Sequence, residues 1–437
     1  MSSFDPVAMR VGMAWQGGAR SAVALLAMGM MFVGGVIALA WPEQAGATAQ
    51  WSRKYQVPCG TCHTVFPRLN PYGERFMRNG YQNPDAESPD GDEKKRRIGQ
   101  NLVLDDVSNL LGFRLSLTPL KVQENGTTVA GDKRSQLTIG DANWIQFFVA
   151  GSIFKDVSFF TEMEFEDDAF GFTWWKLGFH NLGGTTAANV TMGNVSPIEF
   201  SSHSNRLRIV VPVSNAVYAV RTANGSGDDD LSVSGSLPGI QYYGYKGPAI
   251  WWAGVSPGSS SADVNDSRYY WAGGRLEVSE AQASPFEGSN VSLWAMTGED
   301  GNDTAAPTTV NRTSNTTRYQ VAGNLRHGAL DVQGSYVWGE DDDGNLATAA
   351  QDKFEFDGVA FQAAYRLTDR WYPAISYDNV SKQLAGVALE DVRTITPSIS
   401  YLPRDNMRLG LYATLDLNND TGHDGTSSLL INLRTMF

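Results

Sequence analysis

Cysteine is almost absent from this chain, which has only Cys59 and Cys62 in 437 residues. A secreted scaffold that depends on several disulfides is therefore excluded. Charged side chains are also scarce, at 19% against roughly 25% in ordinary soluble domains. The charge that is present is mainly negative, with a formal net value of −13, and such a surface repels nucleic acid. We therefore expect no nucleic-acid partner.

Long apolar runs are absent except near the N-terminus. Residues 22–40 are continuously apolar, they follow Arg10 and Arg20, and Ala47-Thr48-Ala49 beyond them has the small-x-small pattern of a cleavage site. These features predict a bacterial secretory signal over residues 1–49, although an uncleaved anchor helix would contain a similar run. Since no second apolar run of about 18 residues follows, we expect no bundle of membrane helices.

Aromatic residues and glycine, in contrast, are abundant. The chain has 20 Phe, 16 Tyr, 12 Trp and 45 Gly, yet its mean hydropathy is only −0.27. A transmembrane β-barrel has this composition, because its lipid-facing and lumen-facing residues alternate and average out. We therefore predict an all-β fold in which residues 98–437 form a porin-like outer-membrane barrel of about 16 strands.

Alternation with a period of two supports this fold. In residues 407–417, 359–367 and 318–326, apolar side chains occupy one parity and mainly polar ones the other. Such alternation indicates strands with one apolar face. The last residues alternate as well and end on Phe437, an ending that resembles the recognition signal for outer-membrane barrel assembly. A soluble β-sandwich or propeller is the alternative fold.

Acidic residues of the predicted barrel fall into two groups. On the strand at 157–166, alternation places Glu162, Glu164 and Glu166 on the lumen side, where carboxylates could attract cations. Other acidic residues form clusters in predicted loops, where they could concentrate cations at the mouth: Asp228–Asp230, Glu299-Asp300 with Asp303, and Glu340–Asp343. The simpler interpretation of both groups is an ordinary polar lumen with solvated loops.

The two cysteines form the motif Cys59-Gly60-Thr61-Cys62-His63. Two thiols three positions apart can both add to haem vinyl groups, and the adjacent His63 can then bind the iron as the proximal ligand. A thioredoxin-like redox pair would need a βαβ context, and a zinc site would need further cysteines. The sequence offers neither, so we predict one covalent haem c in a cytochrome c module over residues 50–97.

A short helix is predicted after the motif. Asn70 can cap its N-terminus, Pro71 suits its first position, and Gly80 follows its last turn. Met77 on this helix is the only methionine of the module, so it is the simplest candidate for the second axial ligand of the iron. An open position is one alternative, and a ligand from the barrel is another: His180, His203, Met163 or Met192.

These patterns together resemble the outer-membrane cytochrome–porin fusions of iron-oxidising bacteria. The resemblance is carried by Trp51-Ser52-Arg53, Cys59-x-x-Cys62-His63, Pro67-x-Leu69-Asn70, Gly73-x-x-Phe76 and Asn79-Gly80-Tyr81, and in the barrel by the stretch Gly193–Phe200. It implies an iron:cytochrome c oxidoreductase-type activity that oxidises Fe(II) outside the cell. The electron would pass through the haem to a periplasmic cytochrome or another soluble carrier, and outer-membrane lipid would surround the barrel.

The charge distribution fits a haem module that plugs the barrel lumen. Residues 50–97 carry a net charge of +3, and residues 98–437 carry −16. A module of this size could fill a 16-stranded lumen, which would otherwise hold water. Because electron tunnelling weakens steeply with distance, we expect the haem within the lumen. The alternatives are a diffusion porin with an accessory haem, and a barrel in which the haem only stabilises the fold.

Overall fold

The fold is described from a computed structural model. The residues that it describes are 49–84, 96–97, 103–104, 109–127, 133–166, 169–204, 208–210, 213, 215–220, 233, 235–258, 268–301, 313–343, 352–389, 391–418 and 426–437. The predicted secretory signal over residues 1–49 lies outside these ranges apart from Ala49. Within them, the helices are too short or too polar for any to cross a membrane.

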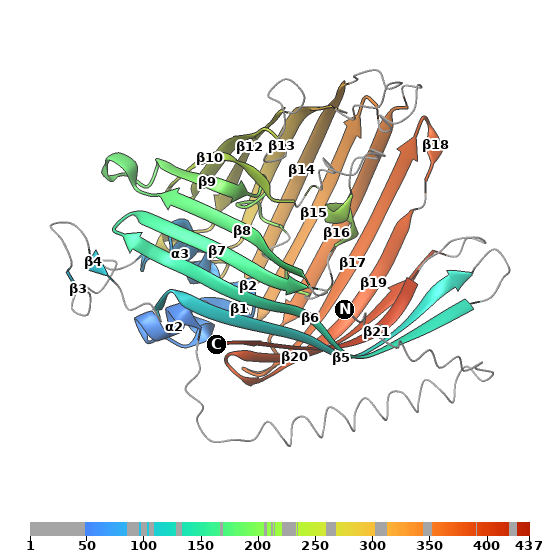
Figure 1. Cartoon of the computed structure of the whole chain (residues 1–437), viewed down its shortest axis with the longest axis horizontal. Coiled ribbons are helices and arrows are strands. Elements are labelled where there is room, and N and C mark those ends of the chain that lie inside the picture. The colour runs from blue at the N-terminus through green and yellow to red at the C-terminus, as the bar shows by residue number, and fades with distance from the viewer. Residues whose placement is uncertain are drawn as a thin grey trace, which may run out of the picture. The chain divides into compact units, whose positions relative to one another are not determined.

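Among the described residues, sixteen long antiparallel strands form the wall of a closed barrel (Figure 1). Each pairs with its neighbours along the chain, and β21 pairs with β5 to close the barrel. A two-residue strand, β18 (Val387–Ala388), extends the hairpin between β17 and β19. The predicted 16-stranded barrel is confirmed. The strands are β5 (Leu111–Thr127), β6 (Lys133–Phe154), β7 (Val157–Glu166), β8 (Ala169–Phe179), β9 (Asn189–Val195), β10 (Leu237–Lys246), β11 (Ala249–Ser256), β12 (Arg268–Glu277), β13 (Asn290–Gly301), β14 (Thr313–His327), β15 (Leu330–Asp341), β16 (Phe354–Tyr365), β17 (Trp371–Leu384), β19 (Val392–Arg404), β20 (Met407–Asp416) and β21 (Thr426–Met436).

The two ends of the barrel differ in their connections. β5 begins and β21 ends at one of them, where several strands are joined by tight turns such as Lys155-Asp156, Gly247-Pro248 and Asp405-Asn406. The longer connections, including those that follow β9 and β13, lie at the other. We call these the short-turn end and the long-loop end. In outer-membrane barrels the short turns face the periplasm.

The alternation in the sequence assigns the two faces of the wall. On β14, Tyr319 and Val321 are 38% and 46% exposed, whereas Arg318 and Gln320, which alternate with them, are at most 1% exposed. The apolar parity therefore points outward and the polar parity points into the lumen. An outer surface of exposed apolar side chains matches the lipid-facing band of a membrane barrel.

Phe437 fixes the seam between β21 and β5. Its backbone amide donates to the carbonyl oxygen of Phe113 at 2.8 Å, and the amide of Phe113 donates back to the carbonyl oxygen of Phe437 at 3.0 Å. The two rings also stack, with centroids 5.9 Å apart. The residue thus adds a backbone pair and an aromatic contact where the barrel closes.

We expect deletion of Phe437 to reduce insertion into the outer membrane, because it removes both hydrogen bonds and the stacked ring at the seam. Heat-modifiable mobility of the membrane fraction on gels measures the inserted protein. Phe437→Tyr keeps the backbone pair and an aromatic ring, so it serves as the control and should insert normally. Equal insertion of the deletion variant and the parent would contradict a role for Phe437 in assembly.

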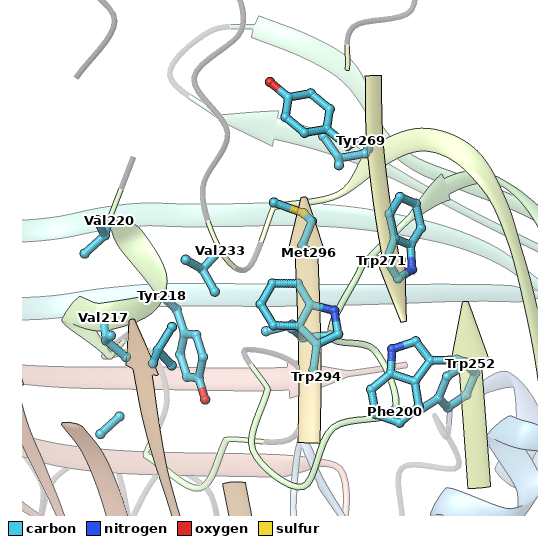
Figure 2. Packing of buried hydrophobic residues seen from close by; sticks show 14 of the residues in the cluster. Phe200, Val217, Tyr218, Val220, Val233, Trp252, Tyr269, Trp271, Trp294 and Met296 are labelled. Carbon is cyan, nitrogen blue, oxygen red and sulfur yellow. The ribbon is translucent and has the colours of Figure 1, made fainter. Parts of the chain in front are cut away.

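Aromatic side chains fill part of the lumen, which the sequence led us to expect as polar. Phe200, from the long connection between β9 and β10, lies beside Trp252 of the wall with ring centroids 6.1 Å apart, as Figure 2 shows, and Tyr218 of the same connection belongs to the same buried cluster as Trp294. On some strands, therefore, both the lumen-facing and the outward-facing side chains are apolar. We call the following residues the lumen cluster: Val195, Ile198, Phe200, Val217, Tyr218, Val220, Val233, Leu237, Tyr243, Ile250, Trp252, Tyr269, Trp271, Trp294, Met296, Val337, Phe354, Phe356, Ala360 and Val380.

The module that contains the cysteine motif is built from short elements. The helix predicted after the motif is confirmed: the side-chain Oδ1 of Asn70 accepts the amide of Gly73 at 2.9 Å, and Pro71 is the first helical residue. Gly80 beyond it has a φ of 68°, in the left-handed region that glycine favours. The elements of the module are α2 (Gln50–Tyr55), η1 (Cys59–Thr61), β1 (His63–Val65), β2 (Arg68–Leu69) and α3 (Pro71–Arg78). The remaining short elements are β3 (Arg96–Arg97), β4 (Val103–Leu104), η4 (Leu182–Gly184), η5 (Ala216–Ala219) and η6 (Glu280–Gln282).

Buried ion pairs hold the module against lumen-facing residues of the wall. Glu74 of α3 is 3% exposed, and it pairs with Arg275 on β12 and, at 2.8 Å, with Arg326 on β14. Arg68 makes two hydrogen bonds of 2.9 and 3.0 Å to Asp331 on β15. Such pairs are costly to break, because a lone partner leaves an unpaired buried charge. We call Glu74–Arg275, Glu74–Arg326, Arg68–Asp331 and Arg78–Glu277 the docking ion pairs.

Candidate haem site

A pocket beside the cysteine motif is the candidate site. Its cavity volume is about 50 Å³, below the roughly 300–1,000 Å³ that ligand pockets commonly span. It lies at the short-turn end, because Asn406, in the β19–β20 turn, and Met436, at the end of β21, complete its wall. Its lining is mainly apolar and aromatic: Ala49, Trp51, Ser52, Tyr55, Val57, Pro58, Cys59, Cys62, His63, Phe66, Tyr72, Phe76, Asp405, Asn406 and Met436.

Both cysteines of the motif are free thiols that line this pocket. The 3₁₀ turn η1 brings them together, and the amide of Cys62 donates to the carbonyl oxygen of Cys59 at 3.1 Å. Burial, with a contribution from the negative charge of Asp405, raises the pKa of the Cys59 thiol, and burial raises the pKa of Cys62 to about 11. A catalytic disulfide-exchange pair needs a lowered thiol pKa instead. The site therefore suits covalent attachment better than redox exchange.

His63 is oriented by a hydrogen bond within its own loop. Its Nδ1 lies 3.2 Å from the carbonyl oxygen of Pro67, which can only accept, so Nδ1–H donates and Nε2 keeps its lone pair. Metal-ligating histidines usually have this arrangement, in which the second ring nitrogen donates to a carbonyl or carboxylate. Burial lowers the pKa of His63 to about 4, so near neutral pH the imidazole is in the neutral form that binds metals. The residue fits the role of proximal ligand.

Asn70 ties the cysteine motif to α3. While its Oδ1 caps the helix, its Nδ2 donates to the carbonyl oxygens of Gly60 at 3.1 Å and Thr61 at 2.9 Å. Its backbone amide also donates to the carbonyl oxygen of Cys62 at 2.9 Å. One side chain thus holds the loop between the two thiols to the start of the next helix.

Gly73 lets α3 approach the motif this closely. A Cβ atom at this position would lie 2.1 Å from the carbonyl oxygen of Cys62, a distance that no side chain tolerates. The backbone is fixed on both sides of the contact, by the turn at Cys62 and by the capped helix. The Gly73-x-x-Phe76 pattern in the sequence is therefore explained by close packing of backbone on backbone at Gly73 and by the pocket wall at Phe76.

We expect Asn70→Ala to lower the fraction of protein that carries haem and to destabilise the module by about 1–3 kcal/mol, because the cap and two further hydrogen bonds are lost. Asn70→Asp is the matched variant, since a carboxylate still caps the helix but cannot donate to Gly60 or Thr61. The haem-to-protein ratio and the thermal unfolding curve measure the two effects. Parent-like values for both variants would contradict this role of Asn70.

Aromatic side chains form one wall of the pocket. Trp51 stacks on Tyr81, with ring centroids 4.8 Å apart and planes 13° apart, and meets Phe76 edge-on at 5.6 Å. Tyr55 also meets Phe76 edge-on, at 5.5 Å, and its hydroxyl donates to the carbonyl oxygen of Tyr81 at 3.0 Å. Trp51 and Tyr81, which lie 30 positions apart in the sequence, are thus brought together. The resulting wall is flat and apolar, which suits a porphyrin ring.

Met77, the predicted second axial ligand, does not line this pocket. It lines a separate small pocket with Phe160 and His180 and packs against the lumen cluster. Tyr72 and Phe76 of the same helix do line the candidate site, so α3 presents different residues to two sides. The assignment of Met77 as an iron ligand stays a prediction.

The alternative axial ligands from the barrel are also held elsewhere. Both ring nitrogens of His180 are hydrogen-bonded, Nε2 to the Ser158 hydroxyl at 2.6 Å and Nδ1 to the Tyr243 hydroxyl at 2.7 Å. His203 lies buried beside Tyr218. Met163 and Met192 are paired on neighbouring strands with the exposed residues Phe147 and Ile240, so they belong to the outward parity.

The acidic residues of β7 lie on the predicted face but are engaged by neighbours. Glu162 is buried on the lumen side, where it accepts hydrogen bonds from Arg114 at 3.0 Å and from Gln146 at 2.5 Å. Gln146 also donates to Glu164. The side chain of Glu166 lies outside the described part of the chain. Glu162 therefore acts as a partner for a lumen arginine.

The Glu340–Asp343 cluster is not a uniformly solvated loop. Asp341 is buried and pairs with Arg318 at 2.8 Å, and Asp343 is buried as well. Glu340 and Asp342 are the members with accessible side chains, and Glu340 pairs with Lys353 at 2.8 Å. Any attraction of cations by this cluster would thus come from Glu340 and Asp342. The clusters at Asp228–Asp230 and Asp303, and the side chain of Asp300, lie outside the described residues.

Comparisons with known proteins support the barrel. No protein-family model matches the chain, and neither does any curated protein. Among solved structures, the in-vitro folded OmpT, an outer-membrane protein of Vibrio cholerae, is similar with a TM-score of 0.51 and 12% identity, over 77% of this chain and 99% of that one. Salmonella typhi OmpF, in complex with daunomycin, is similar with a TM-score of 0.51 and 12% identity, over 78% of this chain and 100% of that one. An anion-selective porin from Comamonas acidovorans is similar with a TM-score of 0.51 and 11% identity, over 75% of this chain and 99% of that one. At these identities the likeness concerns the fold alone: the chain contains a barrel with the fold of outer-membrane porins.

Proposed function

We propose that the chain is an outer-membrane electron-transfer protein whose c-type haem is bound covalently at the short-turn end of a porin-fold barrel. The observation that carries the proposal is the pocket where Cys59, Cys62 and His63 meet, with Nδ1 of His63 already bonded to a backbone carbonyl. When bound, the haem supplies the one-electron redox step. The exposed apolar band of the barrel supports a location in lipid.

The residues of the chain hold this group and set its surroundings. The thiols of Cys59 and Cys62 form the covalent attachment, and Nε2 of His63 offers a neutral nitrogen ligand while the Pro67 carbonyl keeps the tautomer fixed. The aromatic wall around Trp51 excludes water from one side of the pocket. Burial and hydrogen bonding to the ligand are the means by which a protein sets the potential of a haem.

We propose Fe(II) outside the cell as the electron donor and a periplasmic cytochrome or another soluble carrier as the acceptor. The resemblance of residues 51–81 to iron-oxidising fusion proteins supports the donor. The position of the pocket at the short-turn end supports the acceptor, because that end faces the periplasm in barrels of this kind. The pocket lies at the short-turn end rather than deeper in the lumen, where we expected the haem, so an electron that enters at the long-loop end would have to cross the lumen cluster to reach it.

Anaerobic mixing of the oxidised, haem-loaded protein with Fe(II) tests this function. With the protein inserted in vesicles so that only the long-loop end meets the reductant, we expect the reduced haem α-band to appear, and to appear faster than with a bulky reductant that cannot enter the barrel. Glu340→Gln combined with Asp342→Asn should slow the reaction at low salt by at most about tenfold, because exposed charges steer a cation only within roughly 10 Å at 0.1 M ionic strength.

Glu280→Gln is the matched control for the steering effect, because this exposed acidic residue follows β12 at the short-turn end. It should leave the rate of reduction by Fe(II) unchanged. If Fe(II) fails to reduce an attached haem at every acidic and neutral pH, Fe(II) oxidation is contradicted. If reduction occurs but does not respond to the mouth residues or to salt, electron transfer stands and the steering effect is contradicted.

A diffusion porin with an accessory haem is the second candidate, and the shared fold with solved porins favours it. The lumen cluster and the docking ion pairs, in contrast, favour a closed lumen in the described part of the chain. Conductance of single proteins in a planar bilayer separates the two. An electron conduit should be nearly closed, whereas a diffusion porin should give regular open-channel steps with or without Fe(II).

A further inference from the structure

Four arginines gather inside the barrel near the candidate haem site. Arg408 on β20 and Arg434 on β21 are direct partners in the antiparallel ladder, and each is 3% exposed. Arg208, which follows β9 in the chain, is close enough to Arg114 and Arg408 that burial and these two charges lower its pKa to about 10. Arg434 lies within electrostatic range of the other three. We call Arg114, Arg208, Arg408 and Arg434 the arginine cluster.

Arg114 of this cluster already pairs with Glu162 at 3.0 Å, so the positive charge that calls for a further anion is that of Arg408 and Arg434. Like charges placed opposite each other on neighbouring strands are destabilising, and buried charges normally have a partner of opposite sign. Arg408 instead donates to neutral oxygens, those of the Ser400 hydroxyl at 2.9 Å and the Phe66 and Ile209 carbonyls at 2.8 and 3.4 Å. Nε of Arg434 is buried with no partner among the described residues.

The arginine cluster adjoins the pocket of the cysteine motif. Phe66, whose carbonyl accepts from Arg408, lines that pocket, and its ring lies 5.3 Å from the imidazole of His63. On the barrel side, Asn406 and Met436 also line the pocket, and each lies two residues from an arginine of the cluster, Arg408 and Arg434 respectively. Pocket and cluster therefore share the same strand ends.

We propose that the arginine cluster binds the propionate carboxylates of the haem, an inference that rests on the haem site proposed above. The two propionates project from the edge of the porphyrin opposite the vinyl groups, so a haem held through its vinyl carbons by Cys59 and Cys62 directs both carboxylates away from these thiols. Guanidinium groups bind carboxylates through paired hydrogen bonds with matching geometry. The pairing would offset only part of the positive charge of the cluster, and the charge that remains would favour the reduced haem, because nearby positive charge stabilises the form with one more electron.

Charge-removing variants of the haem-loaded protein test the proposal. Arg408→Gln and Arg434→Gln should each shift the propionate bands of the resonance Raman spectrum. Each should also lower the ratio of reduced to oxidised haem at a fixed solution potential by about tenfold, which equals about 59 mV for one electron. Arg393→Gln, an exposed arginine on β19, is the matched control and should change neither readout.

The outcomes separate this inference from the proposed function. A parent protein without covalent haem refutes the function, and this inference with it. An attached haem whose propionate bands and potential are unchanged in both glutamine variants overturns the inference alone. Thermal stabilisation of the haem-loaded parent by inorganic phosphate, lost in Arg434→Gln, would also overturn it, because the cluster would then bind a free anion. Where a glutamine variant fails to fold, Arg408→Lys and Arg434→Lys keep the charge, and they should shift the bands with little change in potential.

Discussion

Cys59→Ala and Cys62→Ala should each remove the stable covalent haem from the protein, and the double variant should carry none. In the proposed site each thiol would supply one of the two thioether bonds, and both thiols line the same pocket. The expected effect is complete on a denaturing gel stained for haem peroxidase activity, where the band of the parent disappears. Protein staining of the same gel shows that the chain itself is still produced.

Gly60→Ala is the matched control for the two cysteine variants. It lies between the two thiols, yet no atom lies within 4 Å of the position that its Cβ would occupy. The substitution should therefore leave the haem band unchanged. A haem band of normal strength in both single cysteine variants and the double variant would contradict the covalent site altogether.

The second large effect is expected at Glu74. Glu74→Ala should weaken docking of the module in the barrel by about 3–5 kcal/mol, because it leaves the buried guanidinium groups of Arg275 and Arg326 without their carboxylate. The module should then be cut rapidly by trypsin in membranes where the parent resists. Conductance through the barrel should rise as well, since the short-turn end loses part of its filling.

Glu280→Ala is the control for this effect. Glu280 also pairs with an arginine of α3, Arg75, at 2.9 Å, but its side chain is 66% exposed. Exposed ion pairs contribute about 0–1 kcal/mol, so protease resistance should stay close to that of the parent. Equal resistance of the Glu74 and Glu280 variants would contradict the assignment of Glu74 as the main anchor.

The same carboxylate predicts how docking responds to acid. Burial alone would raise the pKa of Glu74, but the positive charges of Arg275 and Arg326, with smaller effects of Arg68 and Arg78, hold it well below its usual range. The contribution of Glu74 is therefore complete above the ordinary glutamate pKa of about 4.3 and is lost only as the pH falls through the lower folded-state value. Pepsin digestion should show that the module stays protected below about pH 4. Loss of protection near pH 4.3 would contradict the depressed pKa.

Alternation in the sequence was enough to predict the barrel wall, because lipid outside selects apolar side chains on one parity alone. The segment from Arg318 to Arg326 shows this with alternating buried and exposed residues. The cap at Asn70 was predictable for a similar reason, since a helix N-terminus has its own local chemistry. Signals of this kind depend only on neighbours in the sequence.

The lumen cluster was not predictable from the same signals. Trp294 and Met296 occupy the lumen parity of β13, but Val291 and Leu293 on the other parity are apolar too, so the segment gives no clear alternation. What makes the inner parity apolar is a partner far along the chain, the connection that contains Phe200. The alternation of apolar and polar residues in the sequence does not reveal such a partner.

The sequence predicted that the module is attracted to the barrel, but not which residues form the ion pairs between them. The opposite net charges of residues 50–97 and 98–437 led us to expect general attraction. In the buried ion pairs of Glu74 the signs are reversed. Glu74 is an acidic residue of the basic module, and its partners, Arg275 and Arg326, are basic residues of the acidic barrel. These partners lie 201 and 252 positions away. The same docking decides that Met77 faces the lumen cluster while Phe76 faces the pocket.

The position of the pocket also dictates an order of events during biogenesis. Asn406, in the β19–β20 turn, and Met436, at the end of β21, complete its wall, and β21 closes the barrel against β5. Once that seam forms, Cys59 and Cys62 lie in a half-buried loop beneath it. In the proposed function a haem-attaching enzyme needs the motif to be accessible, so attachment would precede closure of the seam. If haem is bound as proposed, the barrel-folding machinery would receive a chain that already carries the cofactor, and a delay in haem supply should appear as unclosed barrels rather than as empty ones.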